Sequence, residues 1–394
     1  MLKRKHIMLL LEWYDYRIHR GVAKVARQNG WQLNCPKDLA ANEGILKDWK
    51  GDGCIALLEN DGTLEHFRKL KIPLVDLGLR NHKLKVPRVI TDNAAIGRLA
   101  AEHFRDFGHR EVFAIDPGKK AMYRERLEGL RKHLESDGGR VHVLKSSVAI
   151  QHDIIHEMKA LAAERGHALH ELSLGFFAYQ DTMASEMISL CLRQDLKVPE
   201  NVAVLGVDND DLINSGLMMG LSSVDSDQEG LGAEAAHLLQ TMLDDPNKSI
   251  STKIHRHEPI GVVARRSTDC FAVRNPLVAS ALHWIQKNYY KGIQATDVAE
   301  AMGVTQQGLQ KAFASSYSRS PGQEIRHQRV QAVAHLLSTT NAKLEDIAAN
   351  CGYYSVNSLI NSFRNTHKTT PGKYRQQKRS EHGIGTRNKA KTAR

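Results

Sequence analysis

Residues 295–313 read Ala-Thr-Asp-Val-Ala-Glu-Ala-Met-Gly-Val-Thr-Gln-Gln-Gly-Leu-Gln-Lys-Ala-Phe, which predicts two short helices joined by a tight turn. Thr296 can cap the first helix, because its hydroxyl can accept a hydrogen bond from a free backbone N–H. Gly303 stands at the turn, where a residue without a Cβ tolerates a positive φ. Thr305 can cap the second helix, whose outer face carries polar side chains from Gln306, Gln307, Gln310 and Lys311. The stretch therefore predicts a helix-turn-helix unit.

The same pattern recurs in residues 344–364. A small Ala, a turn Gly, a capping Ser and a Leu/Phe pair follow in the same order, and Gly352 comes 49 residues after Gly303. Phe363 likewise comes 50 residues after Phe313. One match of this kind in a helical protein is weak support for DNA binding, but two in register make it strong. The buried pairs are expected to be Leu309 with Phe313 and Leu359 with Phe363.

The positive charge of the chain gathers in the same segment. The 394 residues include 55 Lys or Arg and 44 Asp or Glu, a formal net charge of +11. From Pro276 onward there are 17 Lys or Arg against 6 Asp or Glu, which is the whole excess of 11, and the preceding 275 residues hold 38 of each sign. A generic solvated basic surface does not explain this segregation. The distribution favours attraction to a phosphate backbone.

From about Pro276 to Arg375 the chain resembles the DNA-binding domain of AraC-type transcription regulators. The matching pieces are residues 293–313, a connecting helix with Arg329, Ala334 and Leu337, and residues 347–353, 363–364 and 370–375. The resemblance implies that two recognition helices face DNA, the first through Gln307, Gln310 and Lys311 beside Gln306, the second through Val356, Asn357, Asn361 and Arg364. Asn361 stands where many relatives have arginine, and Val356 replaces a frequent polar residue. The second half-site is therefore expected to be read weakly, or partly through a thymine methyl group.

The segment between and around the two units sets the expected domain boundaries. Ser320-Pro-Gly-Gln323 predicts the capped start of a connecting helix that runs to about Leu337. A rigid connector of this length could place two recognition helices about one DNA turn apart. We predict a short linker leading into the reader at residues 271–285, the reader at residues 286–375, and a basic, disordered tail at residues 376–394.

The first 270 residues alternate strand-like and helix-like runs. Short apolar strands are predicted at residues 7–11, 54–58, 74–77, 89–91, 112–115, 174–178 and 202–207. Helices are predicted at about residues 17–29, 93–108, 182–194 and 230–243. Short apolar strands separated by helices indicate doubly wound parallel α/β sheets. In such sheets ligands bind in the crevice beyond the carboxyl ends of the strands.

Polar and aromatic residues directly follow these predicted strands. They include residues 12–16, Asp92, Asp116, Gln180, Asp181, Asp208 and Asn209, with Arg124 and Arg126 opening a helix. Carboxylates, amides and an arginine around one cleft suit a neutral polyhydroxylated ligand, because sugar hydroxyls donate to acidic oxygens and accept from a guanidinium. Rings such as Trp13, Tyr14 or Tyr16 can stack on the C–H faces of a sugar. A helix cap or a surface ion pair is the commoner role of a single Asp; the shared position after successive strands favours binding.

This order of pieces resembles the effector domain of LacI/GalR-type repressors, itself similar to periplasmic sugar-binding proteins. The matching stretches are residues 89–110, 126–129, 178–184, 198–209, 221–236 and 262–268. The resemblance places the family's sugar-contacting arginine on Arg126, its amide or acid pair on Gln180 and Asp181, and its late aspartate on Asp208. Trp13, Tyr14 and Asp15 complete the candidate ligand set. LacI-type repressors carry their helix-turn-helix at the N-terminus, and this chain departs from them by beginning with the first strand.

A LacI-like sensor at residues 1–270 followed by an AraC-type reader resembles the xylose-responsive members of the AraC-type family. The resemblance implies a homodimeric transcription activator whose partners are double-stranded DNA, RNA polymerase and a sugar effector, D-xylose. Nothing in residues 13–16 selects a pentose. An AraC-type regulator that answers to another sugar or small effector therefore stays open as the alternative.

Other classes of protein fit the sequence less well. It contains no glycine-rich phosphate loop, serine elbow or metal-spaced cluster among its 20 histidines, so we expect no enzyme, catalytic residue, metal or cofactor. A secreted sugar-transport protein would need a signal peptide, but the apolar residues 7–11 are followed at once by Glu12 and Trp13. No run approaches the roughly 20 apolar residues of a membrane helix. The five scattered cysteines are expected as free thiols in a reducing cytoplasm, without a membrane partner.

Overall fold

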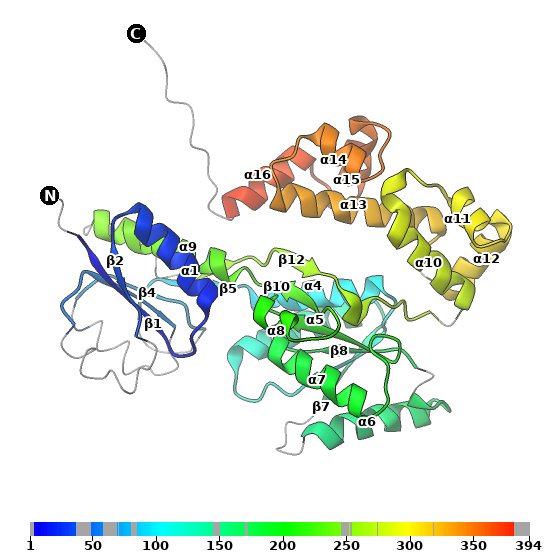
Figure 1. The fold of residues 1–394 in the computed structure, drawn as a ribbon, viewed down its shortest axis with the longest axis horizontal. Helices are drawn as coiled ribbons and strands as arrows, with labels where there is room; N and C mark the ends of the chain where they lie inside the picture. Colours follow the sequence, from blue (N-terminus) through cyan, green and yellow to red (C-terminus); the bar gives the residue numbers. More distant parts are fainter. Residues whose placement is uncertain are drawn as a thin grey trace, which may run out of the picture. The chain divides into compact units, whose positions relative to one another are not determined.

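The computed structural model describes residues 4–36, 49–57, 71–79, 85–144, 150–169, 172–245, 254–273, 275–317 and 319–381, together with residues 69 and 252. The chain divides into two compact units, which are described separately below and most of whose helices and strands are labelled in Figure 1. The first unit comprises residues 1–95, 119–122 and 226–259. The second comprises residues 96–118, 123–225 and 260–394.

The described part of the first unit contains a six-stranded parallel sheet of order β11-β5-β4-β3-β1-β2. Its strands are His6–Leu11 (β1), Gln32–Asn34 (β2), Gly53–Leu57 (β3), Leu74–Asp76 (β4), Arg88–Thr91 (β5) and Ile254–His257 (β11). Helices α1 (Tyr16–Gln28) and α9 (Gln228–Asp244) share one apolar core with this sheet. The two helices pack closely, because a Cβ on Gly21 would lie only 2.0 Å from the carbonyl oxygen of Glu229.

The described part of the second unit contains a sheet of order β12-β10-β9-β8-β6-β7, parallel except for the antiparallel edge pair β10 and β12. Its strands are Glu111–Ile115 (β6), Arg140–Leu144 (β7), Leu174–Phe177 (β8), Val202–Val207 (β9), Ser222–Asp225 (β10) and Gly261–Val263 (β12). The accompanying helices are α4 (Asn93–Asp106), α5 (Ala121–Glu135), α6 (Ile150–Glu164), α7 (Asp181–Arg193) and the short α8 (Asp211–Ser215).

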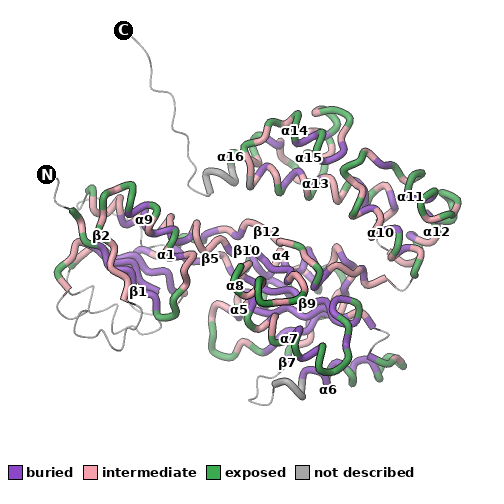
Figure 2. Tube along the Cα trace, in the orientation of Figure 1, coloured by how far each residue is buried: buried purple, intermediate pink, exposed green. Residues whose placement is uncertain are grey.

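Strands β3, β8 and β9 are buried at every position, as the purple segments of Figure 2 show for the sheet interiors. Parallel sheets carry helices on both faces, so their strands are continuous apolar runs instead of alternating ones. This is the pattern on which the α/β prediction rested. The predicted doubly wound class is confirmed.

The C-terminal part of the second unit is all-helical. It contains α10 (Pro276–Asn288), α11 (Ala295–Ala301), α12 (Gln306–Ser316), α13 (Pro321–Thr339), α14 (Leu344–Asn350), α15 (Val356–His367) and α16 (Pro371–Glu381), with 3-10 turns at Arg266–Thr268 (η2) and Tyr289–Lys291 (η3). One apolar cluster contains the predicted pair Leu309 and Phe313, and a second contains Leu359 and Phe363. All four side chains are fully buried. The two predicted helix-turn-helix units are therefore confirmed, each with its own core.

Several helix ends differ from the predictions. Thr296 does not cap the first helix of the motif, because α11 already begins one residue before it and the hydroxyl lies inside the first turn. The Asp297 carboxylate instead accepts a hydrogen bond from the backbone N–H of Gln294 at 2.7 Å. The other predicted caps are confirmed, and they are Thr305 on α12, Ser320 on α13 and Ser355 on α15. Helix α16 continues to Glu381, into the predicted tail. Residues 382–394 of that tail and Leu58 of the second predicted strand lie outside the described residues.

All five cysteines are free thiols, and Cys54, Cys191 and Cys351 are buried. In the part of the chain that the structure describes, no helix combines the length and the apolar character needed to cross a membrane.

A buried histidine links the last strand of the first unit to the start of α9. His257 is 2% exposed, and its ring nitrogens lie 2.6 Å from Glu234 Oε2 and 2.9 Å from Asp227 Oδ2. Burial by itself lowers the pKa of His257. The hydrogen bonds and charges of the two carboxylates outweigh burial and raise the pKa to about 9. The charged imidazolium therefore stabilises this unit.

We expect the first unit to lose stability as the pH rises toward 9. The folded-state pKa of His257 lies above that of an unfolded histidine, about 6.5, so its contribution is fully present below that pH. The contribution is lost as the pH passes the folded-state pKa of about 9, a loss on the order of 3 kcal/mol. Urea unfolding of the wild type and His257→Gln across this range measures it. A difference between the two proteins that does not shrink with rising pH would contradict the expectation.

Candidate ligand and DNA-binding sites

The candidate ligand residues of the second unit lie near the switch point of its sheet. After β6 the chain adds β7 on one side and then β8 on the other, so the winding reverses between β6 and β8. Gln180 lies between β8 and α7, Asp181 is the first residue of α7, and Asp208 follows β9. The crevice at such a reversal is the usual ligand site of doubly wound sheets. The sheet order thus brings these predicted residues to one edge.

Arg126 on α5 is almost enclosed, with 1% of its surface exposed. Its Nη1 donates a hydrogen bond to the carbonyl oxygen of Tyr179, and its Nη2 lies 3.9 Å from Asp208 Oδ1. Burial lowers the pKa of Arg126, and the negative charge of Asp208 opposes that shift. A guanidinium stays protonated even so. Arg126 is therefore a fixed, charged hydrogen-bond donor beside Asp208.

The turn after β9 has an unusual backbone. Asp208 and Asn209 have φ angles of 100° and 47°. Non-glycine residues rarely adopt positive φ, and those that do cluster at functional sites. Side chains on both sides hold the turn, because Asn209 N donates to Ser223 Oγ at 2.9 Å and Arg265 Nη2 donates to Asn209 Oδ1 at 2.7 Å.

Gln180 and Asp181 are neighbours with different roles. Asp181 is 3% exposed, and its carboxylate accepts from Ser223 Oγ and from the backbone N–H of Asp210, both at 2.7 Å. It therefore holds the loop after β9 against β10. Gln180 is half-buried and makes no capping hydrogen bond at the start of α7. Of the predicted pair, Gln180 is the better placed to meet a ligand, while Asp181 shapes the site.

Two tyrosines at this edge are absent from the predicted set. Tyr123 and Tyr179 stack with ring centroids 4.9 Å apart and planes at 17°, and the Tyr179 hydroxyl donates to the carbonyl oxygen of Ile115 at 2.6 Å. The Arg126 guanidinium carbon lies 6.0 Å from the centre of the Tyr123 ring. The available signals were the position of Tyr179 just after β8 and the i, i+3 spacing of Tyr123 and Arg126 on one helix.

In the first unit, Trp13, Tyr14 and Asp15 follow β1 directly. Trp13 and Tyr14 are 42% and 45% exposed. Asp15 caps α1, where it accepts from the backbone N–H of Arg17 at 2.8 Å and pairs with Arg17 Nη2 at 2.6 Å. The capping role that is common for a single Asp therefore applies to Asp15. The Tyr14 ring meets the His19 ring edge to face, with centroids 5.7 Å apart, and its hydroxyl lies 3.0 Å from His19 Nδ1.

Seven of the eight predicted DNA-contacting residues are exposed; they are Gln306, Gln307, Gln310, Lys311, Asn357, Asn361 and Arg364. Val356 is half-buried, because it packs against the apolar cluster of the second helix-turn-helix unit. Neither α12 nor α15 contains an acidic residue. Two exposed, acid-free helices rich in amides suit contact with phosphates and base edges.

The two helix-turn-helix units touch where the turn of the second meets residues 289–292, which precede α11 of the first. Arg329 on α13 donates to the carbonyl oxygen of Tyr289 at 2.9 Å. A Cβ on Gly352 would lie 2.5 Å from that same oxygen, so the second turn contacts the backbone of the first unit. The Tyr354 hydroxyl adds a hydrogen bond to the carbonyl oxygen of Gly292 at 3.2 Å. These contacts hold the start of the first helix-turn-helix unit against the turn of the second.

Two family models match separate parts of the chain. A periplasmic binding protein-like domain matches residues 101–268, and a helix-turn-helix domain matches residues 298–377. The xylose operon regulatory protein of Escherichia coli (strain K12) is 28% identical in an alignment 387 positions long, which covers 95% of this chain and 97% of that protein. The chain is an AraC-type helix-turn-helix regulator with a periplasmic-binding-protein-like domain.

Solved structures agree with the fold of this AraC-type regulator. A xylose-binding transcription activator matches with 26% identity and a TM-score of 0.56, covering 95% of the regulator and 99% of that chain. A LacI family regulator from Enterococcus faecalis V583, solved with bound ribose, matches with 20% identity and a TM-score of 0.53 over 67% of the regulator and 98% of that chain. The second likeness shows the fold alone. Neither of the two matched family models describes a catalytic domain.

Proposed function

We propose that this regulator binds a sugar at the strand ends of its α/β part and controls transcription through its paired helix-turn-helix units. The observation that carries the sugar site is the buried Arg126 beside Asp208 and a stacked tyrosine pair. Fixed donors, acceptors and ring faces in one place are what a polyhydroxylated ligand needs. The two exposed, acid-free helices α12 and α15 support the DNA half of the proposal.

We place the sensor at residues 1–270 and begin the reader with α10. Residues Val278, Ala281, Leu282 and Ile285 of α10 share one apolar cluster with Leu309 and Phe313 of α12. A helix that supplies the core of the first helix-turn-helix unit is part of that domain. The sequence-based boundary at residue 286 divides this helix, so we move the boundary to Pro276.

We propose D-xylose as the effector and activation of a xylose operon as the outcome. The names of the two relatives that span 95% of the chain support this choice. The regulator then acts in the cytoplasm as a homodimer and recruits RNA polymerase. Sugar binding can shift DNA binding only if the sugar prefers one arrangement of the protein. A different sugar or small effector is the second candidate, because Trp13 and Tyr14 are not specific to pentoses.

Fluorescence anisotropy on DNA upstream of the gene and of neighbouring sugar operons tests both halves. The protein is titrated at fixed salt without sugar and with D-xylose, arabinose, ribose or glucose. We expect specific binding that D-xylose alone tightens or rearranges. A response to another sugar would correct the effector, and specific binding that ignores every sugar would remove the sugar site from the proposal. No specific binding to any fragment would contradict the DNA half.

Gln310→Ala is expected to weaken specific DNA binding by about 1–3 kcal/mol, because a glutamine that pairs with an adenine edge carries that much discrimination. Binding to unrelated DNA should change little. Gln331→Ala, an exposed glutamine on α13, is the matched control and should leave both affinities unchanged. Anisotropy on operator and scrambled duplexes measures the difference. Equal losses on both duplexes would mean that Gln310 contacts phosphate and reads no base.

A further inference from the structure

A line of hydrogen bonds leaves the turn at Asp208 and Asn209, within the second compact unit of the chain. Arg265 donates from Nη2 to Asn209 Oδ1 at 2.7 Å and from its backbone N–H to Ser222 Oγ at 2.8 Å. Thr268 Oγ1 donates to the same Ser222 Oγ at 2.7 Å. Ser222 and Thr268 are fully buried. The turn that carries a candidate ligand residue is thus tied to η2.

His103 on α4 continues this line. Its Nε2 lies 2.8 Å from Thr268 Oγ1. Burial lowers the pKa of His103 to about 4, against the opposing charge of Asp106, so the ring is neutral near pH 7. Because Thr268 gives its proton to Ser222, the neutral His103 is the donor to Thr268. The His103 ring also lies 4.9 Å from that of Phe107, centroid to centroid.

Three residues further along α4 from His103, a junction with the reader is formed by Asp106, Tyr317, Arg319, Glu324 and His327. Asp106 accepts from Arg319 Nη2 at 2.6 Å and from His327 Nε2 at 2.9 Å, and its carbonyl oxygen accepts from the Tyr317 hydroxyl at 2.8 Å. Arg319 also donates to the fully buried Glu324 at 3.1 Å. Burial by itself raises the pKa of Asp106, but His327 and Arg319 hold it at about 2.

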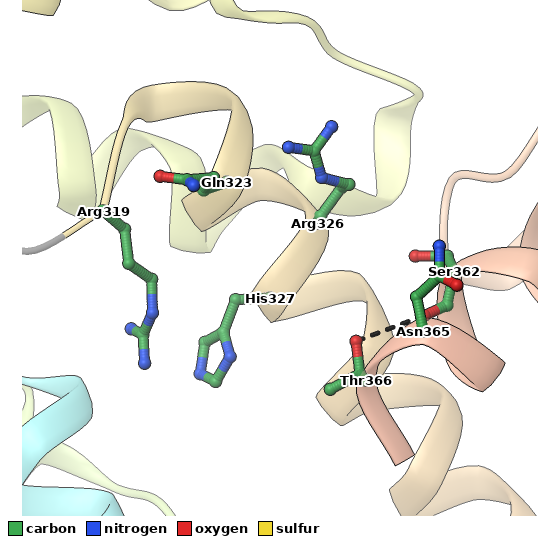
Figure 3. A pocket seen from close by; sticks show the side chains of 7 residues that line it. All are labelled: Arg319, Gln323, Arg326, His327, Ser362, Asn365 and Thr366. Carbon is green, nitrogen blue, oxygen red and sulfur yellow. Dashed lines mark hydrogen bonds between the residues drawn. The ribbon is translucent and has the colours of Figure 1, made fainter. Parts of the chain in front are cut away.

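Apolar packing attaches the same end of α4 to the first helix-turn-helix unit. Phe107 stacks on Phe271 with centroids 4.9 Å apart, and both belong to the buried cluster of Leu309 and Phe313. The buried apolar cluster of the second helix-turn-helix unit, within the described residues, begins at Val330. A cavity of about 520 Å³ joins residues near the junction to α15. Figure 3 shows its lining residues, namely Arg319, Gln323, Arg326, His327, Ser362, Asn365 and Thr366. The junction therefore packs against the first helix-turn-helix unit and meets α15 across a cavity.

We propose that Thr268 and Asp106 are positioning residues that carry the ligand state of the Asp208–Asn209 turn to the first helix-turn-helix unit. Apart from the fully buried Glu324, the charges at this junction are half-buried. Removing them from water offsets part of what their ion pairs return, so we infer that the cluster selects one geometry more than it adds stability. The second helix-turn-helix unit is coupled to the first through α13 and through the contact at Gly352. This inference rests on the proposed function for its input, a sugar, and its output, DNA binding.

Three variants of the full chain test the coupling. Thr268→Val removes the hydroxyl and keeps the shape, Thr268→Ser restores the hydroxyl, and Asp106→Asn removes the charge at the junction. Sugar affinity by calorimetry and sugar-free DNA affinity should stay at wild-type values. The sugar-induced change in DNA affinity, on the order of 5–150-fold in allosteric proteins, should fall close to onefold in Thr268→Val and Asp106→Asn and return in Thr268→Ser. A full sugar effect in Thr268→Val would overturn the proposal.

Hydrogen exchange on the same proteins needs no ligand and separates this inference from the proposed function. Thr268→Val and Asp106→Asn should speed amide exchange in α12 and leave exchange in α15 unchanged, because the junction packs against the first helix-turn-helix unit. No change, or equal changes in both helices, would overturn the coupling. If exchange changes as expected while the wild type ignores every sugar, the junction stands and the proposed effector fails.

Discussion

Arg126→Ala should abolish sugar binding while leaving sugar-free DNA binding intact. The guanidinium is 1% exposed and stands beside Asp208, so no water or neighbouring cation can replace it without rearrangement. Hydrogen bonds from a charged group are worth roughly 1.5–3 kcal/mol each, and the loss of two predicts a fall in affinity of about 100-fold or more. Isothermal titration calorimetry with D-xylose, next to anisotropy on the operator, measures both properties.

Two further variants make this result specific. Arg124→Ala removes an exposed arginine from the same helix and should bind sugar like the wild type. Arg126→Lys keeps a positive charge but loses the planar fork, so it should recover only part of the affinity. Thermal unfolding shows whether Arg126→Ala is folded at the assay temperature. A folded Arg126→Ala protein with unchanged sugar affinity would disprove the ligand role of Arg126.

Gly352→Ala should disrupt the reader much more than Gly303→Ala, although the two glycines occupy equivalent turns. Both have positive φ, 73° and 66°, so each alanine incurs a cost of about 1–2 kcal/mol from the left-handed backbone. At Gly352 the added Cβ would also lie 2.5 Å from the carbonyl oxygen of Tyr289, whereas nothing lies within 4 Å at Gly303. In Gly352→Ala the turn of the second helix-turn-helix unit must therefore move away from the first helix-turn-helix unit.

Operator anisotropy and thermal unfolding of the two variants give the comparison. We expect Gly303→Ala to keep specific binding with a modest loss of stability. Gly352→Ala should lose specific binding, because α12 and α15 no longer keep the spacing that the two half-sites require. Similar DNA affinities for the two variants would show that the Gly352 contact does not set that spacing.

The elements and their order were predictable because their signals are local. The glycine turns, the capping residues Thr305 and Ser355, and the buried Leu/Phe pairs all act within a few positions along the chain. The α/β class was predictable for a related reason, since strands buried on both faces must be apolar throughout. The predicted cap Thr296 was wrong because Gln294 stands at the N-cap two residues earlier. The backbone N–H of Gln294 donates to the carboxylate of Asp297.

The sequence by itself determined the two kinds of domain, their order along the chain and the edge of the sheet on which polar residues gather. Only the tertiary structure decided which of those residues meet. Arg126 and Asp208 lie 82 positions apart, and their approach depends on how β8 and β9 are placed in the sheet. Asp106 and Arg319 lie 213 positions apart and pair across the junction. Periodicity and capping act over a few residues, whereas the pairing of distant charges depends on how complete layers pack against one another.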